Sequence, residues 1–457
     1  MNWPQVFSDS RFAVLGLGEN GLPAAEALAA MGADVSAWDD DAAKRDAAAA
    51  RKLKVARPSE AGPLDALVLS PGIPHRLPAP HPEVAALTSR GVVVTTDAEL
   101  LYRAVRVAGS RAKFLGITGT NGKSTTTALT AHILGTAGII HAAGANLGPA
   151  ALSLPLLPDD GIYCLEMSSY MLERITALRF DAAAMLNLTP DHLDRHGDME
   201  GYAEAKRRIF ARQDRECTAV VGIDDAPSRA MADDLSASPA RLLRVSGHSA
   251  ADIWADGRLL RDSEGLIVDL SEARALPGAH NAQNAAAAAA LAQAAGVPRG
   301  MIAEGIRSYP GLPHRQAEIA AIDGIRFIDD SKATNADAAA RALGCYDRLI
   351  WIAGGIGKAG GIASLAPCFP RIARAFLIGR DAAEFAATLA AHGVAHEIPG
   401  TLDAAVPAAF HAARDAGIGT VLLSPAAASF DQFANYGERG RRFAELARAL
   451  DCFEEMR

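Results

Sequence analysis

Short apolar runs alternate along the chain with longer alanine- and leucine-rich stretches. The short runs are rich in β-branched residues and predict strands, and the longer stretches predict helices. Examples of the expected strands lie at 12–17, 66–69, 114–117, 162–165, 182–186, 325–328, 349–353, 375–378 and 421–423. Because strands that alternate with helices form βαβ units, the pattern predicts an α/β fold with mostly parallel sheets. Ligands of such sheets bind beyond the carboxyl ends of the strands.

Two breaks divide this pattern. Gly109 and Ser110 end a basic helical stretch just before a new strand, and Pro-Gly-Leu-Pro at 310–313 follows a long alanine-rich helix at 281–295. A chain of 457 residues is too long for one hydrophobic core. We therefore expect three domains, which comprise residues 1–107, 108–310 and 311–457.

Composition excludes several classes of protein. A formal charge of −8 argues against a non-specific nucleic-acid binder, which needs a basic surface. The five cysteines are scattered and show no C-x-x-C spacing, which argues against a disulfide framework or a zinc ribbon. Neither a secretory signal nor an apolar run long enough to span a bilayer is visible. We expect a soluble cytoplasmic protein without a nucleic-acid partner.

A glycine-rich turn follows the first expected strand. Gly16-Leu17-Gly18-Glu19-Asn20-Gly21 opens a helix, and the next strand ends at Asp39 and Asp40. This G-x-G-x-x-G pattern with an acid about twenty residues later is typical of dinucleotide binding. Three readings stay open at this point: a nicotinamide cofactor, another nucleotide phosphate, or a structural turn. Ser70-Pro71-Gly72 follows another strand and either lines the same crevice or forms a plain Pro-Gly turn.

The strongest motif is a phosphate loop in the middle third of the chain. Gly119-Thr120-Asn121-Gly122-Lys123-Ser124-Thr125 lies between a strand and a helix. Its glycines let backbone amides surround an anion, Lys123 neutralises phosphate charge, and Ser124 offers a hydroxyl to Mg²⁺. Ile117 replaces the first glycine of the strict G-x-x-x-x-G-K-[ST] pattern. The loop is therefore a P-loop variant and predicts an ATP site.

Three further polar residues are ambiguous when each is considered alone. Glu166 ends a strand, and is either a surface charge or a magnesium ligand across the crevice from Ser124. His192 lies in a segment that also suits a helix cap. Considered alone, Lys206 would be interpreted as a solvent-exposed charge on a helix.

Taken in order, the motifs resemble those of the Mur ligases over nearly the whole chain. They are T-G-T-N-G-K-S, N-x-x-x-D-H-L-D-R-H-G followed by Y-x-x-A-K, H-N-x-x-N, D-S-K-A-T-N and S-P-A-A-A-S. The resemblance implies a Rossmann-like first domain, a central P-loop ATPase-type domain with a parallel sheet, and a Rossmann-like last domain. It also implies an ATP-dependent ligase that adds D-glutamate to UDP-N-acetylmuramoyl-L-alanine through an acyl phosphate.

The resemblance assigns roles to residues of all three domains. The catalytic residues are Lys123, Glu166, His192 and Lys206, the last carbamylated by bicarbonate or CO₂. Two Mg²⁺ ions are expected on Ser124, Glu166, His192 and the Lys206 carbamate. ATP is expected on Gly119–Thr125, Asn281, Asn284, Arg315 and Asp330. The UDP-sugar is expected on Gly16, Leu17, Gly18, Asn20, Gly21, Asp39, Asp40, Ser70, Pro71, Gly72, Asn146 and Ser168. Glutamate is expected on Lys332, Thr334, Lys358, Ser429, Phe430 and Tyr436 of a monomer.

Alternatives follow from the same motifs. Met171 stands where the family usually has Gln, which removes one expected polar contact. A folylpolyglutamate synthase would share the ATP loop, and an NAD-dependent dehydrogenase would explain only Gly16–Gly21. A non-catalytic nucleotide sensor should have lost the metal or lysine positions, which are present here. The sequence leaves open whether the added glutamate is D or L.

Overall fold

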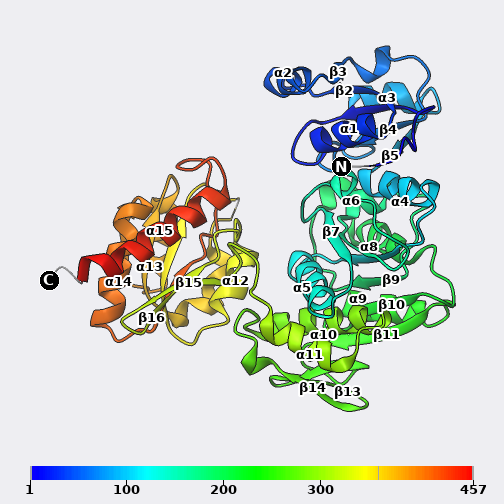
Figure 1. Cartoon of the computed structure of the whole chain (residues 1–457). Helices are drawn as coiled ribbons and strands as arrows, with labels where there is room; N and C mark the ends of the chain where they lie inside the picture. The colour runs from blue at the N-terminus through cyan, green and yellow to red at the C-terminus, as the bar shows by residue number, and fades with distance from the viewer. Residues whose placement is uncertain (1–2, 359, 455–457) are drawn as a thin grey trace. The chain divides into compact units, whose positions relative to one another are not determined.

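The computed structural model describes residues 3–358 and 360–454, which form three sheets (Figure 1). Two compact units contain them: Met1–Arg274 with Ala279–Tyr309, and Ala275–Gly278 with Pro310–Arg457. The second predicted boundary, at 310/311, lies next to the division between the units. The first, at 107/108, lies inside the first unit, between its two sheets, so both boundaries stay predictions.

The first sheet has the strand order β3-β2-β1-β4-β5, and all its neighbouring strands are parallel. Its strands are β1 (Arg11–Leu15), β2 (Asp34–Trp38), β3 (Lys54–Val55), β4 (Ala66–Leu69) and β5 (Val93–Thr95). The helices of this part are α1 (Gly21–Ala30), α2 (Ala42–Ala50), α3 (Pro82–Thr88) and α4 (Asp97–Val107), with the 3₁₀ turn η1 (Pro58–Glu60). The strand order reverses between β1 and β4, which places a ligand crevice beyond their carboxyl ends.

The second sheet belongs to the same unit and has the order β14-β13-β12-β11-β10-β9-β6-β8-β7. Its strands are β6 (Lys113–Thr118), β7 (His141–Ala145), β8 (Ile162–Glu166), β9 (Ala182–Met185), β10 (Thr218–Gly222), β11 (Arg241–Ser246), β12 (Ile253–Asp256), β13 (Leu259–Asp262) and β14 (Gly265–Asp269). Pairing is parallel from β7 to β12, whereas β12, β13 and β14 pair antiparallel. That antiparallel edge was not expected from the sequence.

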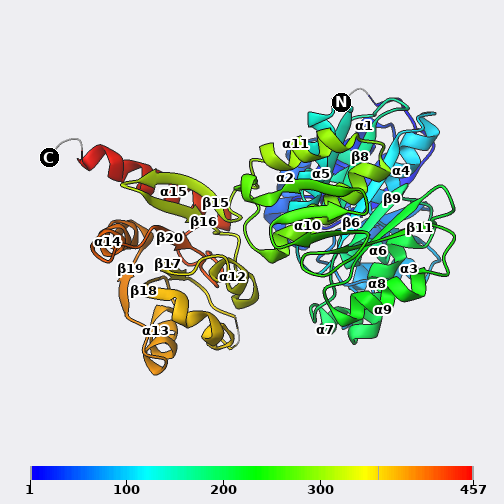
Figure 2. The same ribbon diagram turned by 90° about the horizontal axis from the view of Figure 1, so that it is seen from below.

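Seven helices accompany the second sheet among the described residues. They are α5 (Lys123–Thr136), α6 (Ser169–Leu172), α7 (Leu193–His196), α8 (Met199–Arg207), α9 (Ala226–Leu235), α10 (Ala279–Ala294) and α11 (Arg299–Ser308), with the turns η2 (Ala151–Ser153), η3 (Arg208–Phe210) and η4 (Leu270–Glu272). Helix α10 is buried without interruption from Asn281 to Ala292 and packs against α5 and α11 (Figure 2). A helix that is apolar on every side must be buried, and alanines let its neighbours approach closely. The expected core helix at 281–295 is confirmed.

The third sheet forms the second unit, with the order β15-β16-β20-β17-β18-β19. Its strands are β15 (Ala317–Ile322), β16 (Ile325–Asp329), β17 (Leu349–Gly354), β18 (Ile372–Ile378), β19 (His396–Gly400) and β20 (Thr420–Leu423). Only the β15–β16 pair of this sheet is antiparallel. The helices are α12 (Ala336–Leu343), α13 (Ala382–Ala391), α14 (Leu402–Asp415) and α15 (Tyr436–Glu454), with η5 (Ala363–Arg371). The α/β fold with mostly parallel sheets is confirmed.

Candidate active site

A cavity of about 490 Å³ lies beyond the carboxyl ends of β1 and β4. Nine of the twelve residues predicted to bind the UDP-sugar line it: Gly16, Gly18, Asn20, Asp39, Asp40, Ser70, Pro71, Gly72 and Asn146. Leu17, Gly21 and Ser168 are not among the lining residues. Leu15, Glu19, Lys44, Ile73 and His81 line it as well. Glu19 and Ile73 belong to the two segments expected at this crevice, whereas Leu15, Lys44 and His81 were missed because nothing local in the sequence marks them.

The three glycines of the turn beside this cavity have different structural roles. A Cβ at Gly21 would lie 1.7 Å from the carbonyl oxygen of Gly16, so the third glycine permits close packing of α1 on β1. Gly16 has φ of +91°, and a Cβ there would lie 2.7 Å from Ser70. A Cβ at Gly18 would meet nothing within 4 Å, which leaves this position open for a ligand to approach the backbone.

Acidic residues at the end of β2 are held by specific donors. The amide of Leu17 donates to Asp39 Oδ2 at 2.7 Å, and Lys44 Nζ lies 3.4 Å from the same oxygen. Asp40 Oδ2 lies 3.0 Å from Nε2 of His81, and this hydrogen bond lowers the pKa of Asp40. The acids therefore stay ionised and oriented at neutral pH beside the cavity.

The phosphate loop joins β6 to α5 in a conformation that only glycine adopts readily. Gly119 and Gly122 have φ of +150° and +84°. Asn187 fixes the loop, because its Oδ1 accepts from the amide of Asn121 at 2.8 Å and its Nδ2 donates to the Asn121 carbonyl at 3.1 Å. Lys123 donates to the carbonyls of Gly119 and Thr120 at 3.0 and 2.8 Å. The loop thus presents its lysine and the N-terminus of α5 together, as a phosphate site requires.

Asn281 and Asn284, which are predicted to bind ATP, lie beside this loop. Asn284 Nδ2 donates to Asn281 Oδ1 at 3.0 Å, and both residues are buried at the start of α10. A Cβ at Gly122 would lie 2.2 Å from Asn284 Oδ1, so Asn284 packs directly on the phosphate loop. Ser124 is buried in the first turn of α5, and Thr125 follows it half-buried.

Glu166 ends β8 beside β6 and carries an unsatisfied carboxylate oxygen. Its side chain is 1% exposed, and Asn146 Nδ2 donates to Oε1 at 2.6 Å. Oε2 is buried and has no hydrogen-bond partner among the described residues. A buried carboxylate oxygen without a partner is costly unless a cation occupies the site, so Glu166 fits a Mg²⁺ ligand. Asn146 links this carboxylate to the UDP-sugar cavity, because it also lines that cavity.

Lys206 is the most unusual ionisable group in the first unit. Its side chain is 1% exposed, and Nζ donates to the carbonyl of Gly119 at 2.8 Å. Burial lowers the pKa of Lys206 well below its ordinary value, and the charge of Lys123 lowers it further. The amine is therefore neutral far more often than a surface lysine, and a neutral amine is the nucleophile that reacts with CO₂. Carbamylation of Lys206 stays a prediction.

His192 lies at the start of α7 with a left-handed backbone, φ of +53°. Burial lowers the pKa of His192, Asp191 raises it, and the charges of Lys123 and Lys206 lower it again. The net lowering favours the neutral imidazole, which is the form that binds metals. Within residues 3–358 and 360–454, no group of three or more His, Cys, Asp and Glu side chains is arranged so that it could hold a metal ion. The predicted metal set contains only Glu166 and His192 of these types, so it depends on Ser124 and a modified Lys206.

The second unit holds the remaining predicted ATP residues, Arg315 and Asp330. Asp330 follows β16 and is buried, and Ser424 Oγ donates to its Oδ2 at 2.7 Å. Burial raises the pKa of Asp330 to about 7. Arg315 lowers that pKa by its charge, which shows that the two predicted residues lie near one another.

Because the pKa of Asp330 is raised in the folded protein, the stability of the fold should decrease as the pH rises. The folded state keeps this proton up to about pH 7, whereas the unfolded chain releases it near the ordinary pKa of 3.8. Unfolding therefore releases a proton in this window, and the wild type loses of the order of 3 kcal/mol of stability between pH 4 and pH 7. We expect Asp330→Asn to remove this loss, as measured by urea unfolding of the full chain at pH 5 and pH 8. A constant difference between wild type and variant at both values would contradict it.

The predicted glutamate residues lie on loops that one buried arginine connects. Arg439 in α15 is 1% exposed. It donates to Ser331 Oγ and O at 2.9 and 2.8 Å, to the Ala427 carbonyl at 3.1 Å, and to the Gly354 carbonyl at 3.5 Å. Burial lowers its pKa to about 10. These three loops carry Lys332 and Thr334, Ser429 and Phe430, and Lys358.

Several of these predicted residues are in contact or share a loop. Lys332 Nζ lies 5.1 Å from the centroid of the Tyr436 ring. An isolated bridge pairs Ile356 with Ala428, which brings the loop of exposed Lys358 beside that of Ser429. Ser429 is 2% exposed and Phe430 is 72% exposed. Arg439 was missed by sequence reasoning, because an arginine near a helix start is ordinarily solvated.

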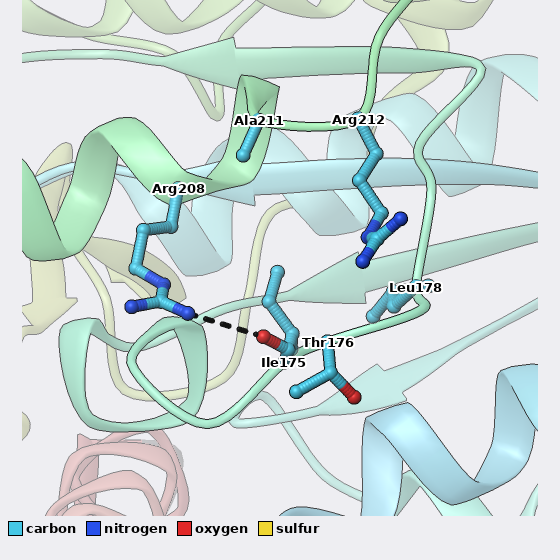
Figure 3. Close-up of a pocket in the computed structure, with 6 residues that line it drawn as sticks. All are labelled: Ile175, Thr176, Leu178, Arg208, Ala211 and Arg212. Atoms are coloured by element: carbon cyan, nitrogen blue, oxygen red, sulfur yellow. Dashed lines mark hydrogen bonds between the residues drawn. The ribbon is translucent and has the colours of Figure 1, made fainter.

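A second cavity of the first unit, about 400 Å³, contains none of the predicted residues. It is lined by Ile175, Thr176, Leu178, Arg208, Ala211 and Arg212 (Figure 3). Arg208 donates to the carbonyl of Ile175 at 3.3 Å, and Arg212 extends along the other side.

No helix among the described residues is long and apolar enough to cross a membrane.

Comparisons with known proteins identify the family of the chain. Residues 117–292 match the Mur ligase middle domain. The chain is 47% identical to a UDP-N-acetylmuramoylalanine--D-glutamate ligase of Paramagnetospirillum magneticum, with 98% of each chain covered. It is 48% identical to the protein of that name from Rhodospirillum rubrum, over 96% of this chain and 94% of the relative.

Solved structures share the fold at low identity. UDP-N-acetylmuramate-alanine ligase MurC from Thermotoga maritima is 16% identical, covers 96% of this chain and 99% of its own, and has a TM-score of 0.61. MurF ligase of Thermotoga maritima in complex with ADP is 15% identical, with 86% and 90% covered and a TM-score of 0.55. At such identities the likeness concerns the fold alone. On the strength of its close full-length relatives, the chain belongs to the UDP-N-acetylmuramoylalanine--D-glutamate ligases of the Mur ligase family.

Proposed function

We propose that this protein joins D-glutamate to UDP-N-acetylmuramoyl-L-alanine, with ATP as the energy source, in the cytoplasm and as a monomer. The observation that carries the proposal is the arrangement around the phosphate loop. There Lys123, the orphan carboxylate oxygen of Glu166 and the buried amine of Lys206 lie close enough for their charges to interact. Full-length relatives that carry the name of this activity support the choice of substrates.

The first reaction step is phosphoryl transfer. A carboxylate oxygen of the substrate's L-alanine attacks the γ-phosphorus of ATP, the bond to the bridging oxygen breaks, and ADP leaves. Lys123 and the amides of the Gly119–Gly122 loop neutralise the phosphate oxygens. Ser124, Glu166, His192 and modified Lys206 would hold Mg²⁺, which offsets the repulsion between phosphate and carboxylate. Asn146 orients the Glu166 carboxylate and lines the cavity assigned to the nucleotide sugar.

The second step forms the amide. The amine of D-glutamate adds to the acyl-phosphate carbon, a proton leaves the nitrogen, and the tetrahedral intermediate collapses as the C–O bond to phosphate breaks. Lys332, Thr334, Lys358, Ser429, Phe430 and Tyr436 are the residues proposed to bind the glutamate. Arg315 and Asp330 are proposed to bind ATP from the second unit.

Carbamylation of Lys206 is part of this proposal. The neutral amine adds to the carbon of CO₂, an electron pair of one C=O bond moves to oxygen, and a proton leaves the nitrogen. The product replaces a disfavoured buried cation by an anion, and its N–H remains able to donate a hydrogen bond. The low pKa of Lys206 supports this chemistry.

An assay of phosphate release tests the function directly. Purified protein receives ATP, Mg²⁺, bicarbonate and UDP-N-acetylmuramoyl-L-alanine, with D-glutamate, L-glutamate, meso-diaminopimelate or no amino acid. Turnover that requires D-glutamate supports the proposal. Turnover with L-glutamate would overturn the stereochemical assignment. No turnover with any amino acid would reject the nucleotide-sugar substrate and favour a folate-type ligase.

A further inference from the structure

The wall of the UDP-sugar cavity is attached to the segment that follows Glu166. Residues Ser70, Pro71, Gly72 and Ile73 form this wall, immediately after β4. The carbonyls of Leu69, Ser70, Gly72 and Ile73 accept hydrogen bonds from donors outside this segment. Such donors come from the part of the chain that carries the second sheet, through Arg174 and Arg195.

Arg174 supplies most of these hydrogen bonds. Its side chain is buried, with 3% exposure, and its guanidinium donates to the carbonyls of Leu69 at 2.8 Å, Ser70 at 3.4 Å and Ile73 at 3.3 Å. Arg195 adds one bond to the Gly72 carbonyl at 3.0 Å. The planar, multidentate donor geometry of arginine suits this role, and lysine could satisfy fewer of the carbonyls.

The two arginines lie on the segments that carry the candidate metal ligands. Arg174 follows Glu166 after the short helix α6, and Arg195 lies in α7, which begins directly after His192. The two segments are also joined to each other, because His196 lies 2.9 Å from Ser169 Oγ and 3.1 Å from Glu173 Oε1. Displacement of the wall would therefore displace both segments.

Ser70 transmits the position of the wall to the glycine turn. Its hydroxyl donates to the Gly16 carbonyl at 2.7 Å. The burial of Arg174 has a cost, which appears as a pKa lowered to about 10. A buried cation without a carboxylate in direct contact is expensive to keep, so its three carbonyl bonds must be the reason for its position.

We propose that Arg174 is a positioning residue for the nucleotide-sugar substrate, and that it couples the cavity wall to the Glu166 segment. This inference rests on the proposed function, because it assumes that the cavity binds UDP-N-acetylmuramoyl-L-alanine. Arg174 is not among the residues that line the cavity. Its effect should therefore appear as weaker binding of the nucleotide sugar, with the phosphate loop and its ATP affinity preserved.

Arg174→Met and Arg174→Lys test the proposal in the full-length protein. We expect the KM for UDP-N-acetylmuramoyl-L-alanine to rise roughly tenfold in Arg174→Met and by a smaller factor in Arg174→Lys. The KM for ATP and the Kd for ADP, measured by calorimetry, should stay within about twofold of the wild type. Arg212→Met, an exposed arginine of the same unit, is the matched control and should leave all of these values unchanged.

Four outcomes separate the hypotheses. A wild-type KM in Arg174→Met would overturn the positioning role. Equal losses of nucleotide-sugar and ADP affinity, together with a lower melting temperature, would show general loosening and also overturn it. If Arg174→Met does not fold, Arg174→Lys and Arg195→Met decide the question, because each should raise the same KM alone. A wild-type protein that does not turn over the nucleotide sugar would instead reject the proposed function.

Discussion

Lys206→Ala should lower kcat by about a thousandfold or more, which corresponds to roughly 4 kcal/mol of lost transition-state stabilisation. Lys206 is buried against the Gly119 carbonyl, and its low pKa prepares the amine for reaction with CO₂. Alanine removes the group that would carry the anionic charge. Steady-state kinetics with saturating ATP, nucleotide sugar and D-glutamate measure the loss.

Lys206→Arg provides the informative comparison, because it keeps a cation and a hydrogen-bond donor but cannot form a carbamate. We expect it to be nearly as inactive as Lys206→Ala. Wild-type protein kept in CO₂-depleted buffer should lose activity and regain it with bicarbonate, and ¹³C-labelled bicarbonate should give a carbamate signal only in the wild type. An active Lys206→Arg enzyme would show that the lysine acts as a cation. Lys54→Ala, at an exposed position, controls for handling of the protein.

Glu166→Gln should lower kcat/KM by about a hundredfold to a thousandfold and raise the Mg²⁺ concentration needed for half-maximal rate. The amide keeps the shape of the side chain and its contact with Asn146, but removes the negative charge. Oε2 of Glu166 has no protein partner among the described residues. The substitution should therefore mainly weaken the binding of a cation. The rate as a function of Mg²⁺ concentration is the measurement.

Glu204→Gln is the matched control, because Glu204 is an exposed carboxylate on α8, two residues before Lys206. It should leave the Mg²⁺ dependence unchanged. If Glu166→Gln loses rate without any change in Mg²⁺ requirement, Glu166 acts on the substrate or on Lys206 and is not a metal ligand. Thermal unfolding of both variants would show whether the loss comes from the fold.

The fold was predictable where a local pattern decides the structure. All nine strands expected from apolar runs are present, and 66–69 agrees with β4 at both ends. The β12–β14 edge was not expected, because its short strands Ile253–Asp256, Leu259–Asp262 and Gly265–Asp269 alternate with charges and turns. Such strands are stabilised by pairing with neighbours rather than by their own sequence.

The candidate site was predictable to the extent that it lies within contiguous motifs. The phosphate loop needs glycines at set positions, and these are visible in the sequence. By contrast, Asn187 fixes that loop from 66 residues away. Asn187 belongs to a motif that the sequence shows, but its contact with the loop was not predicted. Arg174 and Arg439 belong to no such motif, and an isolated arginine in a sequence is most often solvated. Their burial depends on carbonyls that only the assembled chain brings together.

Arg439 joins the loops that carry the residues proposed to bind the amino acid. A guanidinium that binds Ser331, Ala427 and Gly354 at once ties three loops into one stiff body. Loops that are joined in this way cannot adjust individually to a bound ligand. On the proposed assignment of the glutamate residues, an amino acid that displaces one of these loops must strain all three. Discrimination among amino acids would then come from rigidity, and a bulkier amino acid would be rejected by the combined stiffness of the loops.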